Sequence, residues 1–105
     1  MAYRNYGRGT MFTLEQLPKK WQRLAYKAAD DIADRIESGD AFWEELNSET
    51  CILAEQMLPG PDEGGDFRPI RIPSGQYVDG QSLVYDWQTA VEALVEEQFD
   101  DVDEA

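Results

Sequence analysis

Carboxylates are the side chains through which this sequence could most plausibly do chemistry. The 105 residues include 22 Asp and Glu against nine Lys and Arg. Two carboxylates across a scissile bond could act as the acid and base of a glycosidase. Nearly all of these acids, however, fall on expected helix faces or near the C-terminus, where solvation is the ordinary role of a charged side chain. We therefore expect the protein not to be an enzyme.

Other catalytic and metal-binding groups are scarce. The chain has no histidine, so it lacks the commonest general base and the usual activator of a Ser or Cys nucleophile. Cys51 is the single cysteine and falls within an expected helix, where it is better explained as a small buried side chain than as a nucleophile. It can make neither an internal disulfide nor a zinc site. The acids near the C-terminus lack the loop of about twelve residues that gives calcium sites their affinity. We expect no catalytic residue, no metal and no cofactor.

The arrangement of the acids is more informative than their chemistry. Asp30, Asp34 and Glu37 are spaced so as to share one helix face, with Asp31 one step around it. Helical residues four apart lie about 6 Å apart along the axis, close to the roughly 7 Å between successive phosphates of a DNA strand. Rows of carboxylates could therefore copy the charge pattern of DNA, although an ordinary solvated face explains any single row almost as well. Further acids fall on the second and third expected helices: Glu44, Glu45, Glu49, Glu55, Asp86, Glu92, Glu96 and Glu97.

Charge is unevenly distributed along the chain. The net charge is −13, beyond the magnitude of about 2–8 that solubility alone requires of a small domain. Residues 1–28 hold six of the nine cations and only one acid. Such a field attracts basic surfaces, most of which hold DNA or RNA, and it nearly excludes free nucleic acid and anionic membranes as partners. We expect Lys19, Lys20, Arg23 and Lys27 to pair with the protein's own acids; docking to a second copy or to a mixed-charge partner are alternatives.

Hydrophobic periodicity predicts a mostly α fold with a minor β component (α+β minor), built from three principal helices. The first runs from about Pro18 to Ser38 and ends at Gly39; the second covers Ala41–Met57, with Asp40 as N-cap and Pro59 after its end. A short β-hairpin is expected between the second and third helices, and the third helix begins near Ser82. Its expected apolar face consists of Val84, Trp87, Val91, Leu94 and Phe99.

Length and composition predict one small acidic domain over 1–105, since chains of this size usually build a single core. A flexible N-terminal arm at 1–12, a mobile loop at 59–66 and a disordered acidic tail at 100–105 are expected from their composition. No apolar run approaches the roughly 18–20 residues needed to cross a bilayer. We expect a soluble cytoplasmic protein, in the host cytoplasm if a phage encodes it.

In size, charge and lack of catalytic machinery the chain is similar to the small acidic anti-restriction and anti-CRISPR proteins of bacteriophages and mobile elements. That resemblance implies a viral, non-enzymatic DNA mimic that occupies the nucleic-acid-binding surface of a nuclease or CRISPR effector. Two alternatives remain open: an antitoxin or immunity protein that neutralises a small basic toxin, and a phage structural or assembly protein that forms homo-oligomers. The expected partner-binding residues are Asp30, Asp31, Asp34, Glu37, Glu44, Glu45, Glu49, Trp43, Glu92 and Glu96, with Tyr85 as a further hydrophobic anchor.

Overall fold

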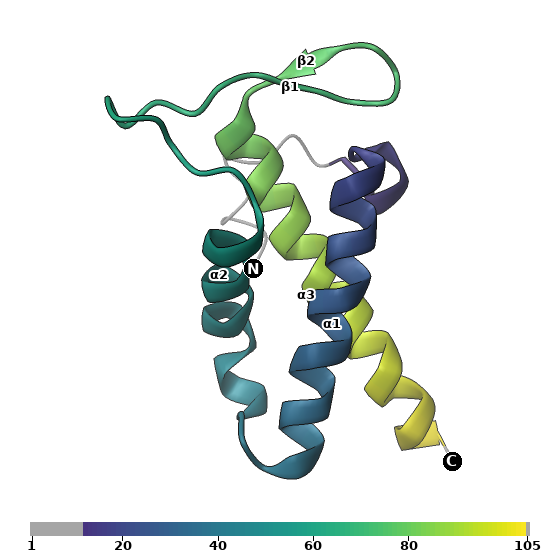
Figure 1. The fold of residues 1–105 in the computed structure, drawn as a ribbon. Coiled ribbons are helices and arrows are strands. Elements are labelled where there is room, and N and C mark those ends of the chain that lie inside the picture. The colour runs from purple at the N-terminus through teal and green to yellow at the C-terminus, as the bar shows by residue number, and fades with distance from the viewer. Residues whose placement is uncertain (1–11, 105) are drawn as a thin grey trace.

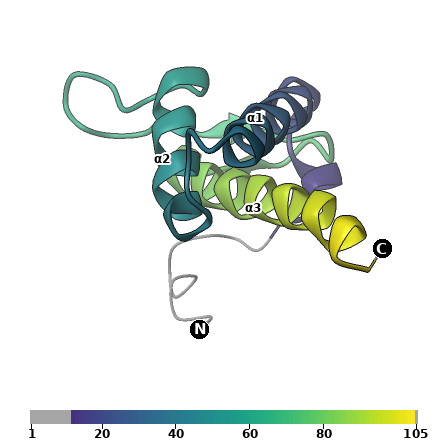
Figure 2. The same ribbon diagram turned by 90° about the horizontal axis from the view of Figure 1, so that it is seen from below.

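Three long helices and a β-hairpin make up the computed structural model, which describes residues 12–104 (Figure 1). Helix α1 descends, α2 returns beside it, and α3 crosses both (Figures 1 and 2). The expected fold class, mostly α with a hairpin between the second and third helices, is confirmed. In chain order the elements are η2 (Leu14–Gln16), α1 (Lys19–Ser38), η3 (Trp43–Glu45), α2 (Leu46–Met57), β1 (Ile70–Arg71), β2 (Tyr77–Val78) and α3 (Gly80–Glu104).

Helix α3 supplies the centre of the core. Its side chains at every fourth residue, Leu83, Trp87, Val91 and Val95, are all 0% exposed. This stripe is shifted from the expected one, because Val84 and Leu94 are only partly buried. A helix that packs against one neighbour needs one apolar stripe, whereas α3 contacts both α1 and α2 and buries a wider face.

Helix α1 presents small residues to the core. Ala25, Ala28 and Ala29 are buried on it, and small side chains allow a neighbouring helix to approach closely. Trp87 Nε1 of α3 donates a hydrogen bond to the backbone oxygen of Trp21 at 3.0 Å. The indole therefore fills the interface between the two helices with its polar N–H satisfied.

The ends of α1 follow the sequence signals. Before the helix, the Thr13 backbone N–H donates to Gln16 Oε1 at 2.8 Å, and Pro18 occupies the N-cap position. At the other end Gly39 adopts a left-handed conformation with φ 88°, which glycine tolerates without a Cβ penalty. Both predicted boundaries are confirmed to within one residue.

The predicted start of the second helix is wrong. Asp40 does not cap it, since Glu45 holds the N-cap position of α2. The backbone N–H groups of Asp40 and Ala41 instead donate to the carbonyl of Arg35, at 2.8 and 3.0 Å. These bonds satisfy a free carbonyl at the end of α1 and hold the chain in a turn. Phe42 is then extended, with φ −111° and ψ 144°. A short 3-10 turn, η3, precedes α2, which begins only at Leu46.

The hairpin follows a turned loop. Asp62 Oδ1 accepts hydrogen bonds from the backbone N–H groups of Gly64 and Asp66, at 2.9 and 3.1 Å. Strands β1 and β2 are antiparallel, with Ile70 opposite Val78, and Gly75 has φ 94° in the turn between them.

The C-terminal backbone differs from what the sequence predicted, and most of the predicted N-terminal arm lies outside the described residues. Helix α3 continues to Glu104, so the backbone of 100–104 is helical where a disordered tail was expected. Adding residues to an existing helix fixes few dihedrals for each hydrogen bond gained, and this favours continuation. The N-terminal arm lies outside the described residues except for Phe12, which packs against the core. Among the described residues no helix is long and apolar enough to cross a membrane.

Gly80 is required by the close approach of the segment before β1 to the start of α3. A Cβ at this position would lie 2.6 Å from the Arg68 carbonyl oxygen and 3.3 Å from Phe67 Cβ. We expect Gly80→Ala to lower the free energy of unfolding by about 1–3 kcal/mol, the usual cost of overpacking, as measured by urea titration. Gly60→Ala is the matched control, since a Cβ there meets nothing within 4 Å. Equal stability of the two variants would contradict the close contact.

Candidate protein-binding site at the acidic end

Carboxylates from three helices gather at the end of the molecule where α1 turns into η3 and α2 and where α3 finishes. This end lies at the bottom of Figure 1 and faces the viewer in Figure 2. We call it the acidic end. It consists of Asp30, Asp31, Asp34, Glu37, Asp40, Glu44, Glu45, Glu49, Glu96 and Glu97.

Three contacts hold these elements together. Arg35 Nη1 of α1 lies 2.7 Å from Glu49 Oε1 of α2. Gln98 Nε2 of α3 donates to Asp30 Oδ1 of α1 at 3.3 Å. The Trp43 and Phe99 rings meet edge to face, with centroids 5.1 Å apart. These contacts bring the acid-bearing segments of α1, η3, α2 and α3 together at one end of the molecule, which their positions in the sequence do not reveal.

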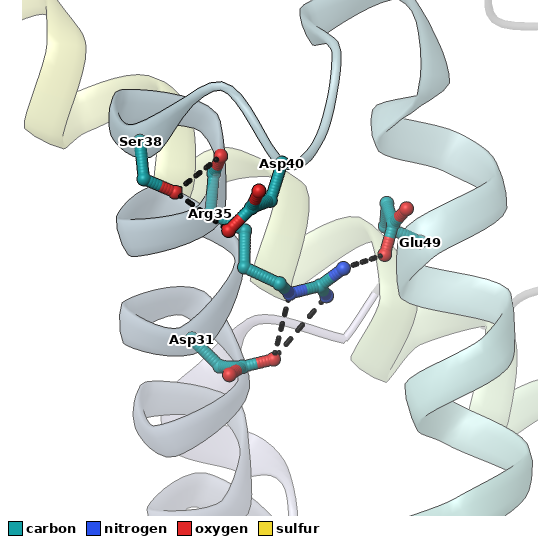
Figure 3. A network of polar contacts seen from close by, with 5 residues as sticks. All are labelled: Asp31, Arg35, Ser38, Asp40 and Glu49. Carbon is teal, nitrogen blue, oxygen red and sulfur yellow. Dashed lines mark hydrogen bonds and ion pairs between the residues drawn. The ribbon is translucent and has the colours of Figure 1, made fainter.

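Arg35 is the cation within this region (Figure 3). Besides Glu49, its guanidinium contacts Asp31 Oδ2, with Nε at 3.3 Å and Nη2 at 3.2 Å. The hydrogen bond with Glu49 raises the pKa of Arg35, and the charges of Glu49 and Asp31 act in the same direction. Asp31 and Glu49 are thus partly neutralised by an internal partner. They offer less negative charge to another protein than their neighbours do.

Other predicted acids remain on the surface. Asp34, Glu37, Glu44 and Glu45 are exposed, and no side-chain hydrogen bond or ion pair to another described residue holds them. Glu96 is exposed on α3 in the same way. Their carboxylates are therefore accessible to a partner. Asp34 and Glu37 lie on α1 as expected, whereas Glu44 and Glu45 lie in η3, ahead of the helix to which the sequence analysis assigned them.

Glu92 lies elsewhere, in the interior between α2 and α3. It is 8% exposed, and its Oε2 accepts hydrogen bonds from Asn47 Nδ2 at 2.9 Å and Thr50 Oγ1 at 3.4 Å. A buried carboxylate needs such donors to offset the loss of hydration. Glu92 therefore joins two helices and is not part of a partner-binding surface. Asp86 is likewise buried, at 4% exposure, and accepts a hydrogen bond from the Phe12 backbone N–H at 3.4 Å.

The two expected hydrophobic anchors, Trp43 and Tyr85, lie in different parts of the molecule. Trp43 is 45% exposed although its ring contacts that of Phe99. Tyr85 is half-buried on α3 and lines an apolar hollow of about 370 Å³ with Cys51, Leu58 and Phe67. Its position is remote from the acidic end. Phe42, which the sequence analysis did not include among the partner-binding residues, is 61% exposed.

Four basic side chains of α1, those of Lys19, Lys20, Arg23 and Lys27, make no ion pair with a carboxylate among the described residues. Both ion pairs in that part of the chain are made by Arg35. The expected internal pairing is therefore not found for these four side chains within residues 12–99. They are exposed on the half of α1 that is farther from the acidic end (Figure 1). The cationic half of α1 therefore lies away from the acidic end.

Cys51 should react slowly with alkylating reagents. Burial raises the pKa of its thiol, and the charges of Glu92 and Glu55 raise it further. The thiolate is the nucleophile, so we expect iodoacetamide at about pH 8 to modify the folded protein several times more slowly than the urea-unfolded chain. Because the pKa is raised in the folded state, this thiol contributes stability below its unfolded pKa and loses that contribution as the pH rises through the folded value. Equal alkylation rates would contradict this burial.

The acidic end can act electrostatically and by apolar contact. Among the described residues no group of three carboxylate, thiol or imidazole side chains is placed to hold a metal ion. Comparison of the chain with protein-family models, with curated proteins and with solved structures finds no significant match, so the function has to be argued from this surface itself.

Proposed function

We propose that this protein is a non-enzymatic inhibitor, of the phage anti-CRISPR or anti-restriction kind, that occupies the nucleic-acid-binding surface of a nuclease or effector complex as a DNA mimic. The observation that carries the proposal is that α1, η3 and α3 all carry exposed carboxylates on the segments that meet at one end of the molecule (Figure 1). Ion pairs to Arg35 are the only ones among the described residues of that end. A surface with this charge complements the basic groove of a nucleic-acid enzyme.

Spacing supports the same proposal. Asp30, Asp34 and Glu37 are exposed on α1, at successive intervals of about 6 Å and about 4.5 Å along the helix axis. A rigid helix presents these charges without the cost of ordering a flexible segment on binding. Association steered by such a field is fast and weakens as salt increases. The proposed site of action is the cytoplasm, and the host cytoplasm if the gene belongs to a phage.

A second candidate function is a structural or assembly role. It is favoured by the exposed cations on the first half of α1, which lack carboxylate partners among the described residues. The cationic half of one copy could dock on the acidic end of the next, and such a head-to-tail contact forms rings or filaments. A mass that rises with protein concentration in sedimentation experiments at low salt would favour this role; a constant monomer mass would remove it.

The test of the inhibitor proposal is capture of the partner. Tagged protein is incubated with a nuclease-treated bacterial lysate at low and high salt, and the bound proteins are identified by mass spectrometry. We expect a nucleic-acid enzyme that is released by salt and displaced by added DNA or RNA. Recovery of one small basic toxin would support an antitoxin instead, and recovery of the protein's own copies alone would support assembly.

A further inference from the structure

Two aromatic side chains protrude at the acidic end. Phe42 is 61% exposed and Trp43 is 45% exposed. They lie in the turn between α1 and α2, after Asp40 and directly before Glu44 and Glu45. Single exposed apolar residues are common on protein surfaces. Two consecutive large aromatic residues between carboxylates are a different feature, because they combine apolar ring faces with negative charge on one short segment.

The fold holds Phe42 outward. Ala41 is 4% exposed, so the small alanine takes the inward position and the phenylalanine that follows it in extended conformation points the other way. The turn itself is fixed by the hydrogen bonds to the Arg35 carbonyl. Trp43 is steadied by its contact with Phe99. The segment is therefore a preorganised surface, which favours its use in binding.

This combination distinguishes between two kinds of nucleic-acid groove. In a duplex the bases are stacked inside, and most protein contacts go to phosphates and sugars. Grooves for single strands combine positive charge with aromatic side chains on which unstacked bases lie. A duplex mimic needs carboxylates alone. A mimic of a single strand needs aromatic rings beside the carboxylates, as Phe42 and Trp43 stand beside Glu44 and Glu45.

We propose that the acidic end fits a groove that binds single-stranded nucleic acid, with Phe42 stacking on an aromatic side chain of that groove and the neighbouring carboxylates in the place of phosphates. This inference rests on the proposed inhibitor function and specifies the partner. The partner's groove carries Lys or Arg for the carboxylates and Trp, Tyr or Phe for the ring. A groove built for duplex DNA alone offers no such platform.

The test uses three labelled peptides of equal length and charge, built from Lys-Lys-Trp, Lys-Lys-Leu or Lys-Lys-Gly repeats, with binding measured by fluorescence anisotropy. We expect the Trp peptide to bind about ten times more tightly than the Gly peptide and also more tightly than the Leu peptide. Phe42→Ala should remove most of this preference and leave binding to the Gly peptide unchanged. Phe42→Tyr should retain the preference. Tyr77→Ala is the matched control, because Tyr77 is 67% exposed but lies in the hairpin.

Each contrary result has its own meaning. Salt-sensitive binding to all three peptides with equal affinity would overturn the single-strand inference and leave the inhibitor proposal standing. Equal affinity for the Trp and Leu peptides would also overturn it, since an ordinary apolar contact would then suffice. A Trp preference that persists in Phe42→Ala would overturn the assignment of this surface. Absence of salt-sensitive binding to any of the cationic peptides would count against the inhibitor proposal itself.

Discussion

Trp87→Ala should lose about 3–5 kcal/mol of unfolding free energy, the usual cost of truncating a buried large aromatic side chain. Trp87 is 0% exposed and lies in the stripe of α3 that α1 covers. Small domains have only about 5–15 kcal/mol of total stability, so the variant should be close to unfolding at 25 °C. Urea titration followed by circular dichroism measures the loss, and a partly unfolded baseline in water would itself agree with the prediction.

Two other variants separate the causes of that loss. Trp87→Phe keeps most of the ring but removes the N–H that donates to the Trp21 carbonyl at 3.0 Å. We expect it to lose about 1–2 kcal/mol, since some volume and one hydrogen bond disappear. Trp43→Ala should cost less than Trp87→Ala, because Trp43 is 45% exposed. Similar losses for Trp43→Ala and Trp87→Ala would contradict the location of the core.

Neutralising four exposed carboxylates should strongly weaken binding to the captured partner. The variant carries Asp34→Asn, Glu37→Gln, Glu44→Gln and Glu45→Gln, all at exposed positions of the acidic end. Exposed ion pairs contribute up to about 1 kcal/mol each. Their combined loss of about 2–4 kcal/mol corresponds to a Kd about 30 to 1000 times larger. Calorimetric titration at low and physiological salt checks this, and the salt dependence of the variant should be weaker than that of the wild type.

The control has the same net charge but leaves the acidic end intact. It carries Glu15→Gln, Glu55→Gln, Glu63→Gln and Asp66→Asn, four exposed acids on other elements. Its Kd should change only a few times, because these sites lie outside the proposed interface. If both variants weakened binding equally, net charge would govern the interaction and the acidic end would have no special role. The stability of the two variants should match, since none of the eight side chains is buried.

Signals within a few residues allowed the larger part of the fold to be predicted. The extent of α1, Gly39 at its end and the hairpin between α2 and α3 were all predicted and are found where expected. These features depend on backbone conformation and on neighbours three or four residues away. The start of α2 was missed because Asp40 is a residue type that often caps helices. In the structure the Asp40 backbone N–H donates to the Arg35 carbonyl at the end of α1, and η3 follows before α2 begins.

The candidate site could be predicted only in part. Charge, spacing and the absence of histidine were enough to favour an acidic binding surface over an active site. Helical spacing placed Asp30, Asp34 and Glu37 on one face of α1, and all three are exposed there. Periodicity could not identify Glu92 as a buried residue, because a helix packed on two sides buries positions that a helix packed on one side exposes.

By itself, the sequence determined the helices, the hairpin and the excess of negative charge, because these depend on residue types and on contacts close along the chain. Only the tertiary structure decided which charges are available. It paired Arg35 with Asp31 and Glu49, buried Asp86 and Glu92, left the lysines of α1 without carboxylate partners among the described residues, and brought Asp30 beside Gln98 and Trp43 beside Phe99. Those outcomes depend on how three helices cross, since burial and pairing are set by neighbours that lie many residues apart in the chain.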